Sequence, residues 1–260
     1  MTHQEIVRKV EWKDLRVLSF KEKMIENNLT IPWFLLSMGF AFYGYYLIAL
    51  PFSFIYFLTA LRQVHNGFHN ALGTNRFLTW LTLYLNSITM MVSIHAVKFN
   101  HLRHHKYCLT EKDYEGKPAG MTWYGAILYG PIHIFKIHWS TLLHANKNYK
   151  KNMAFELASI ALFVFIAFYF QIHILIYHII VMIFGEFMTA FFAVWTVHHD
   201  AHEQPDQART QRTGWKNKIT FSMFYHMEHH LFPAVPTIKL PELAKRIDAA
   251  IPELEKRSTF

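Results

Sequence analysis

The chain has a single cysteine, Cys108, among its 260 residues. One cysteine excludes a disulfide within the chain and agrees with a reducing compartment. It also excludes the structural zinc sites that need paired cysteines. Because His104 and His105 stand close by in the sequence, Cys108 is a candidate metal ligand. The alternative is a small buried residue.

Lysine and arginine are absent from two long stretches, 31–61 and 153–197, although the chain holds 26 such residues and has a net charge of +8. The second stretch contains only Glu156 and Glu186 as acids. A helix that crosses the hydrocarbon layer of a membrane needs about 20 apolar residues. The pattern therefore predicts four crossings in two hairpins, over 31–50, 51–72, 153–170 and 174–197.

The basic residues lie before, between and after these two hairpins. Two hairpins bring these three regions to the same side of the membrane, and the positive-inside rule assigns that side to the cytoplasm. We therefore predict an all-α integral membrane bundle with a cytoplasmic, histidine-rich helical cap and both termini in the cytoplasm. We expect a charged cytoplasmic arm over 1–30, the membrane domain over 31–245 and a C-terminal tail over 246–260.

Other familiar patterns are missing. The first 30 residues are charged and lack the short apolar core of a secretory signal. No compact face of lysine and arginine with interleaved aromatic residues indicates a nucleic-acid partner, so we expect none. The basic balance instead suits an anionic membrane surface. The arm over 1–30 is predicted to lie along that surface or to form a solvated helix.

Two apolar segments between the hairpins are not predicted to cross the membrane. The charge-free run 77–97 is interpreted as an interfacial or re-entrant helix, because a full crossing would separate the histidines on either side of it. The run 123–139 is predicted to be an interfacial segment broken by Gly125, Gly130 and Pro131. A polar loop over 110–120 joins them.

Some polar residues within apolar surroundings have two interpretations. Glu186 lies at membrane depth, where an acid is costly, so it is either functional or a protonated carboxyl bonded to a neighbouring helix. His133, His138 and His144 are not spaced as a cluster, and we expect them to be structural.

The chain is rich in histidine, with 18 residues. Eleven of them form four short clusters, in which positions four apart share one face of a helix. A neutral imidazole is a common ligand of zinc, copper and iron. More than eight ligands exceed the need of one metal, so we expect two metals. The clusters are HNGFH (His65, His69), HLRHH (His101, His104, His105), HHDAH (His198, His199, His202) and HMEHH (His226, His229, His230).

Two histidine-held iron ions at a membrane surface would permit a reaction with O2 that cleaves an unactivated C–H bond, which no side chain does unaided. The rings must be neutral to bind, so acid is expected to release the metal. Nearby polar residues are candidates to hold the ring tautomers, with a solvated surface role as the alternative. These candidates are Asn100, Asp200, Glu203 and Glu228.

HNGFH, HLRHH and HMEHH followed by LFPAVP resemble the three histidine boxes of the membrane fatty acid desaturase superfamily, which includes carotenoid ketolases and hydroxylases and alkane hydroxylases. The resemblance covers about 60–245 and extends to the order and separation of the boxes. Members often take one more ligand just after the last crossing, here His198, His199 or His202. The resemblance implies a di-iron centre, with no catalytic residue beyond its ligands, held by His65, His69, His101, His104, His105, His226, His229 and His230.

The resemblance implies oxygen-dependent desaturation of a fatty acyl chain or related lipid, with a membrane lipid or lipid-linked substrate. The HPGG signature of a fused cytochrome b5 is missing, so electrons are expected from a separate ferredoxin or cytochrome b5. The nearest alternative is a hydroxylase or ketolase of the same superfamily acting on a carotenoid, alkane or other lipid. A haem-binding membrane cytochrome and a metal transporter are alternatives of other classes. Substrate, attacked C–H position and oligomeric state stay open at this point.

Overall fold

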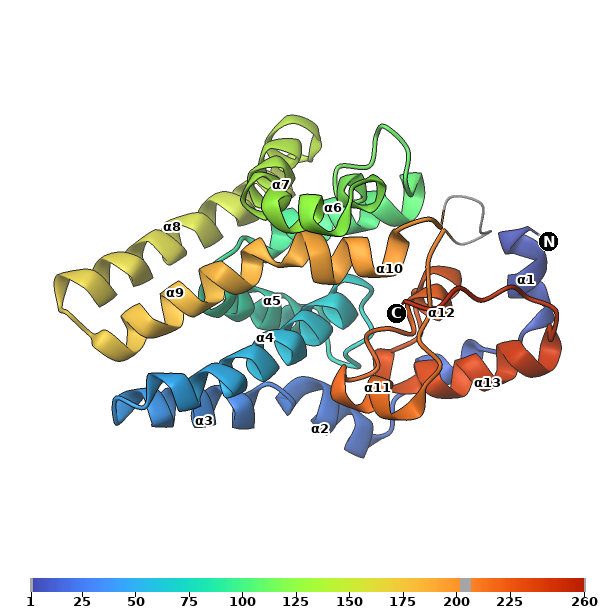
Figure 1. The fold of residues 1–260 in the computed structure, drawn as a ribbon, viewed down its shortest axis with the longest axis horizontal. Helices are drawn as coiled ribbons and strands as arrows, with labels where there is room; N and C mark the ends of the chain where they lie inside the picture. Colours follow the sequence, from blue (N-terminus) through green and yellow to red (C-terminus); the bar gives the residue numbers. More distant parts are fainter. Residues whose placement is uncertain (1, 202–206, 260) are drawn as a thin grey trace.

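A computed structural model of the chain describes residues 2–201 and 207–259. Over these residues the protein is helical, with loops and one isolated bridge between Thr210 and Ser258. The long helices extend from one end of the molecule, and both termini lie at the other end among short helices (Figure 1). The predicted all-α bundle with a helical cap is confirmed. The two hairpins of the bundle are built on α3 (Ile31–Phe42) with α4 (Tyr46–Phe68), and on α8 (Lys147–Tyr169) with α9 (His173–Phe187).

Three helical runs in the described part of the chain are long and apolar enough to cross a membrane: Tyr46–Phe68, Lys147–Tyr169 and His173–His198. A fourth candidate is the pair α5 (Arg76–Met90) and α6 (Ile94–Tyr107), which is bent by 110° and is either a broken span or a re-entrant loop. Large apolar side chains on the outside of these helices are exposed, as expected where lipid is the solvent. The helices therefore identify a membrane protein.

The first hairpin differs from the prediction, because the segment 31–50 is not one helix. Helix α3 has 12 residues and spans only about 18 Å. The chain turns at Gly44, whose φ of +79° favours glycine, and α4 begins at Tyr46. Pro51 consequently lies inside α4 instead of at its start. Uniformly apolar sequence carried no signal for this turn.

The second hairpin turns at Gln171, which has a left-handed φ of +52°. The predicted crossings over 153–170 and 174–197 coincide with the two arms of this hairpin. Its returning arm continues from α9 through a π-helical segment, η3 (Ala190–Trp195), into α10 (Thr196–His198). A π-helical turn holds more residues than an α-helical one and is often found at functional sites. The π-helical segment rotates α10 about its axis, relative to a continuous α-helix, and so changes which residues of α10 face the bundle.

The bend between α5 and α6 is held by the buried acid Glu156 of α8. Its carboxylate accepts hydrogen bonds from Ser93 Oγ (2.6 Å) and from the backbone N–H of His95 (3.1 Å), and it contacts His95 Nδ1 (2.5 Å). Ser93 also caps the first turn of α6. The run 77–97, predicted to be one interfacial or re-entrant helix, is thus two helices that meet at this bend.

Helix α7 (Trp123–His144) is continuous, whereas the sequence predicted a broken segment over 123–139. Pro131 lies inside it, and Gly130 packs directly on the backbone of α9. A Cβ atom at Gly130 would stand 1.7 Å from the carbonyl oxygen of Phe187. The glycine thus serves close packing of two helices and does not end α7.

Replacing Gly130 by alanine is expected to destabilise the bundle by about 1–3 kcal/mol or more, because backbone atoms of α9 must move to admit the methyl group. The measurement is the thermal unfolding temperature of the purified protein in detergent. Gly39→Ala is the matched control, since Gly39 also lies in a helix and a methyl group added there would have nothing within 4 Å. Equal losses of stability in the two variants would contradict the close packing.

The cap buries its own apolar core. Residues of α1 (His3–Lys9), including Ile6, pack with residues of α12 (His226–Leu231) and of α13 (Leu240–Ala250), including Ile247. The N-terminal arm is therefore part of the folded cap, and the predicted boundary between 245 and 246 falls inside α13. The remaining short helices are η1 (Lys13–Arg16), α2 (Phe20–Asn28), η2 (Lys117–Gly120), α11 (Gly214–Ile219) and η4 (Thr237–Lys239).

A buried ionic network joins the cap to the bundle. Glu26 of α2 pairs with Arg62 of α4 (2.5 Å) and accepts a hydrogen bond from Asn66 Nδ2 (2.9 Å). It also accepts the backbone N–H of Ile238, downstream of α12 (3.0 Å). Because a buried charge is tolerated only when it is fully paired, this network fixes the end of α4 against the C-terminal segment.

Candidate metal centre

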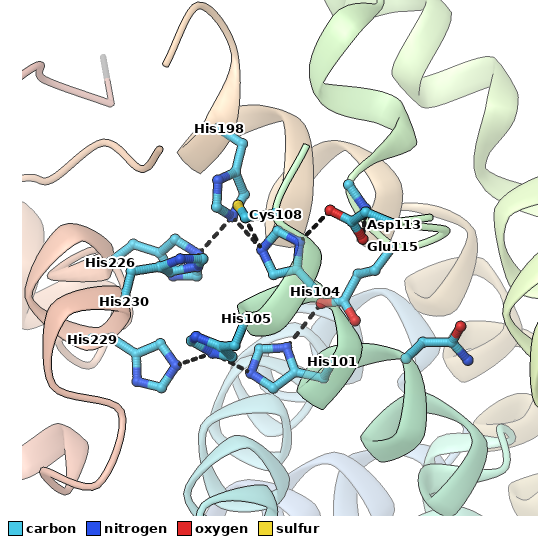
Figure 2. A network of polar contacts seen from close by, with 12 residues as sticks. His101, His104, His105, Cys108, Asp113, Glu115, His198, His226, His229 and His230 are labelled. Atoms are coloured by element: carbon cyan, nitrogen blue, oxygen red, sulfur yellow. Dashed lines mark hydrogen bonds and ion pairs between the residues drawn. The ribbon is translucent and has the colours of Figure 1, made fainter. Parts of the chain in front are cut away.

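Four helices bring the histidine clusters together at the junction of bundle and cap. His65 lies in the last turns of α4, and His69 is the residue that ends it. Helix α6 carries the HLRHH cluster, and α10 and α12 contribute from the C-terminal half (Figure 2). The spacing of four residues places one pair of rings from each of three clusters on the same side of its helix, and each pair belongs to one group: His65/His69, His101/His105 and His226/His230.

The first histidine group contains five rings whose ligand nitrogens all lie within 4.8 Å of one another. Their Nε2 atoms face each other: the separation is 3.1 Å between His69 and His101, 3.1 Å between His101 and His105 and 2.9 Å between His105 and His229. These contacts link three helices that are far apart in the sequence. The members are His65, His69, His101, His105 and His229.

The second histidine group has four buried rings, His104, His198, His226 and His230, with the same 4.8 Å limit. Its Nε2 atoms are 3.0 Å apart between His104 and His198, and 2.9 Å apart between His198 and His226. The two groups adjoin, since His104 and His105 are consecutive and belong to different groups. The centre therefore consists of two neighbouring nests of imidazole nitrogens.

The outer nitrogens of three rings determine what the inner nitrogens can do. His101 Nδ1 contacts Glu115 (2.9 Å), His104 Nδ1 contacts Asp113 (2.7 Å), and His198 Nδ1 contacts the carbonyl oxygen of Gln207 (2.7 Å). A carbonyl or carboxylate oxygen accepts, so Nδ1 carries the proton and Nε2 presents a lone pair. His104 Nε2 and His198 Nε2 thus face each other with lone pairs at 3.0 Å, a contact that a bound cation would satisfy, and the two groups are compatible with two metal ions.

Burial favours the neutral, metal-binding form of most of the rings; His104 is the exception, because burial is outweighed by its hydrogen bonds with Asp113 and Cys108, which raise its pKa well above the ordinary value. Burial lowers the pKa of His226, His229 and His230 well below the ordinary value for histidine, and neighbouring rings lower it further. Burial also raises the pKa of Glu115 to about 8. A cation bound by the first histidine group would favour the ionised carboxylate again.

The structure brings together all eight histidines that the resemblance implied as ligands. Of the three further candidates, His198 joins the second histidine group. His199 lies outside both groups, stacked on Trp195 with its Nδ1 bonded to the carbonyl oxygen of that residue (2.8 Å). His202 lies outside the described residues. The choice between His198 and His199 depends on the face of α10, which the π-helical segment before it sets.

The two carboxylates that orient ligand rings were not predicted. Asp113 and Glu115 come from the loop 110–120, which sequence reasoning treated as a polar connection. The available signal was their place directly after the HLRHH helix, where the loop folds back on α6. Asp113 also accepts the backbone N–H groups of Leu109 and Gly116, so its position is set by the loop itself.

The residues predicted to hold the rings have other roles. Asn100 Nδ2 donates to Thr141 Oγ1 and to the carbonyl oxygen of Ile137, which fastens α6 to α7. Asp200 has an 84 % exposed side chain. Glu203 lies outside the described residues.

Glu228, the remaining candidate, holds helix α12 in position and does not orient a histidine ring. Its carboxylate is fully buried and accepts from Thr210 Oγ1 (2.7 Å) and pairs with Arg212 (2.6 Å). Glu228 therefore positions the helix that carries three of the ligand candidates.

Cys108 is half-buried, with its sulfur 3.9 Å from His104 Nε2. It forms a third possible metal-binding trio with His104 and Asp113. That trio shares His104 with the second histidine group, so Cys108 stands at the edge of this group.

An apolar cavity of about 140 Å³ leads to the centre. Its walls come from α4, the α5–α6 bend, α7, the α9–α10 arm and the segment before α12, and include Leu58, Ile134 and Phe192. His65 and His101 of the first histidine group and His226 of the second also line it. The cavity can therefore hold an apolar chain against rings of both groups.

Comparison with known proteins agrees with this arrangement. A family model described as "Fatty acid desaturase" matches residues 38–258. A search of curated proteins gave no match. The matched region contains the apolar helices and every histidine of both groups. Because the match covers far more than half of the chain, the protein belongs to the fatty acid desaturase family.

Proposed function

We propose that this protein is a membrane-bound di-iron oxidoreductase that uses O2 to desaturate a fatty acyl chain or a related lipid. The observation that carries the proposal is the contact between the apolar cavity and rings of both histidine groups. A cavity with such walls excludes water and holds a hydrocarbon segment. Chemistry on an unactivated C–H bond held there requires a bound redox metal.

The residues present fit two iron ions, one for each histidine group. His65, His69, His101, His105 and His229 would hold the first ion, and His104, His198, His226 and His230 the second. When bound, such ions supply the oxidising power that C–H cleavage by O2 requires.

The chain itself contributes position and protonation. Asp113 and Glu115 keep the proton of the ring they contact on Nδ1, so that Nε2 is free to bind. The apolar wall around Ile134 and Phe192 holds the hydrocarbon segment and keeps water away from it. Neutral imidazole ligands leave the charge of the metal ions uncompensated, which favours a strongly oxidising centre.

The setting of the enzyme follows from the same proposal. The substrate would be a membrane lipid or a lipid-linked acyl chain that enters between the helices. Electrons would come from a separate ferredoxin or cytochrome b5. We place the histidine clusters and both termini on the cytoplasmic side, because the basic residues flank the apolar runs and stay out of them.

The test combines metal analysis with product analysis. We expect about two iron ions per purified chain and new double bonds in the lipids of an expressing host, measured by mass spectrometry. Hydroxyl or keto lipids would favour the hydroxylase or ketolase alternative within the same chemistry. One zinc ion per chain without iron, together with unchanged lipids, would refute the proposal.

A further inference from the structure

Besides the ligand candidates, Glu115 and two threonines, Thr189 and Thr220, two further polar side chains line the cavity. These are Glu186 of α9 and His133 of α7. Each is only 4 % exposed. Sequence reasoning left Glu186 undecided between two roles and treated His133 as structural. The structure brings both to one cavity.

Neither side chain is satisfied within the protein. Glu186 Oε1 and His133 Nδ1 are buried without a hydrogen-bond partner among residues 2–201 and 207–259. A buried polar group left unpaired costs stability, and an apolar residue of similar shape would avoid that cost. The predicted bond from Glu186 to a neighbouring helix is therefore absent in the described part of the chain. Among the described residues, His65 Nε2 and Glu115 Oε2 are also unpartnered at this cavity, but His65 belongs to the first histidine group and Glu115 contacts that group. Glu186 and His133 belong to neither histidine group, and their unpaired atoms indicate a ligand that completes their hydrogen bonding.

The packing of α7 on α9 brings together the helix segments that carry the two groups. Gly130 meets the backbone of Phe187, the residue directly after Glu186. His133 follows Gly130 by one helical turn, on the face of α7 that lines the cavity. The glycine contact thus fixes His133 and Glu186 relative to each other, independently of the metal centre.

Glu186 lies deeper in the bundle than the histidine groups. It precedes His198 by twelve residues along the α9–α10 arm, which is roughly 18 Å at 1.5 Å per residue. On the opposite wall, Phe57 of α4 packs on Gly185, and His65 follows about two turns later. Glu186 is therefore no part of either histidine group, and a ligand that contacts it extends well beyond the ring nitrogens.

We propose that Glu186 and His133 bind a hydroxyl or carbonyl oxygen of the lipid substrate, at a distance from the carbon that faces the histidine groups. A neutral carboxylic acid and a neutral imidazole each offer a donor and an acceptor, which suits such an oxygen. The apolar walls on either side, such as Leu58 and Ile134, suit the hydrocarbon that carries it. This inference rests on the proposed function and narrows its substrate class by excluding hydrocarbons without oxygen, such as alkanes.

The test compares two probes of equal chain length, 1-hexadecanol and hexadecane, by equilibrium binding to the full-length protein in detergent. The wild-type protein is expected to prefer the alcohol by about tenfold more than the Glu186→Leu/His133→Leu variant does, the effect of one well-made buried hydrogen bond. Comparing the ratio of the two affinities between the wild-type protein and the variant cancels the different partitioning of the two probes into detergent. Glu186→Gln keeps a donor and an acceptor and is expected to retain most of the preference.

Unfolding temperature gives a second readout. The leucine variants should be as stable as the wild-type protein or more stable, because they remove unpaired polar groups. The single variants carry the test if the double variant does not fold. An equal alcohol preference in wild-type and leucine variants would overturn this inference. It would mean that water, and not the lipid, completes the hydrogen bonding of Glu186 and His133. Failure of the proposed function shows differently, as absence of iron and of oxidised lipid while the alcohol preference persists.

Discussion

Replacing His104 or His229 by alanine is expected to lower turnover by more than about 100-fold. This loss is larger than the one expected when a residue that only orients a ligand ring is replaced. Each substitution deletes one ring from a different histidine group. A group with one ligand fewer binds its metal more weakly, and the remaining buried lone pairs lose their shared cation. Iron per purified chain should fall from about two toward one or none, as measured by elemental analysis.

His173→Ala is the matched control for these variants. His173 is exposed at the start of α9, in the turn between the two arms of the second hairpin. It should leave iron content and turnover unchanged. All three variants are expected to insert into the membrane normally, because none of the three positions lies in the middle of a candidate span. Full activity in both ligand variants would mean that the histidine groups bind no catalytic metal.

Asp113→Asn is expected to weaken metal binding by about 10- to 100-fold, the usual effect of losing a carboxylate that orients a ligand ring. Asparagine keeps the volume of Asp113 but not its charge, so its neutral amide holds the proton on His104 Nδ1 less strongly than the carboxylate does. Glu115→Gln should act in the same way on His101, and on the first histidine group instead of the second. Chelator competition on the purified protein measures both effects.

Asp200→Asn provides the comparison, because Asp200 follows a ligand candidate in sequence but has an exposed side chain that contacts no ligand ring. Its metal affinity should equal that of the wild-type protein. If Asp200→Asn weakened metal binding as much as Asp113→Asn, net negative charge near the centre would be responsible, and the hydrogen bond from His104 would not matter.

Much of the fold could be predicted because the signals are local. The absence of lysine and arginine over 153–197 marks two helices that must bury or immerse apolar surface, and the structure has them there. The position of the hairpin turn near Gln171 could be predicted from the length of the run without lysine and arginine. Errors arose where local sequence is ambiguous: at Gly44 no change of hydropathy announces the turn, and Gly130 breaks a pattern without breaking a helix.

The order of residues alone shows that histidines four positions apart share one helix face, because this spacing is a property of a single helix. It also shows that the clusters border the apolar runs. Which rings lie in the same group depends on the packing of the helices, which separates His104 from His105 and includes His198 but not His199. The tertiary structure alone supplied Asp113 from a loop and brought His133 and Glu186 to one cavity. These contacts join segments distant along the chain, and their geometry depends on how whole helices pack, which no local pattern records.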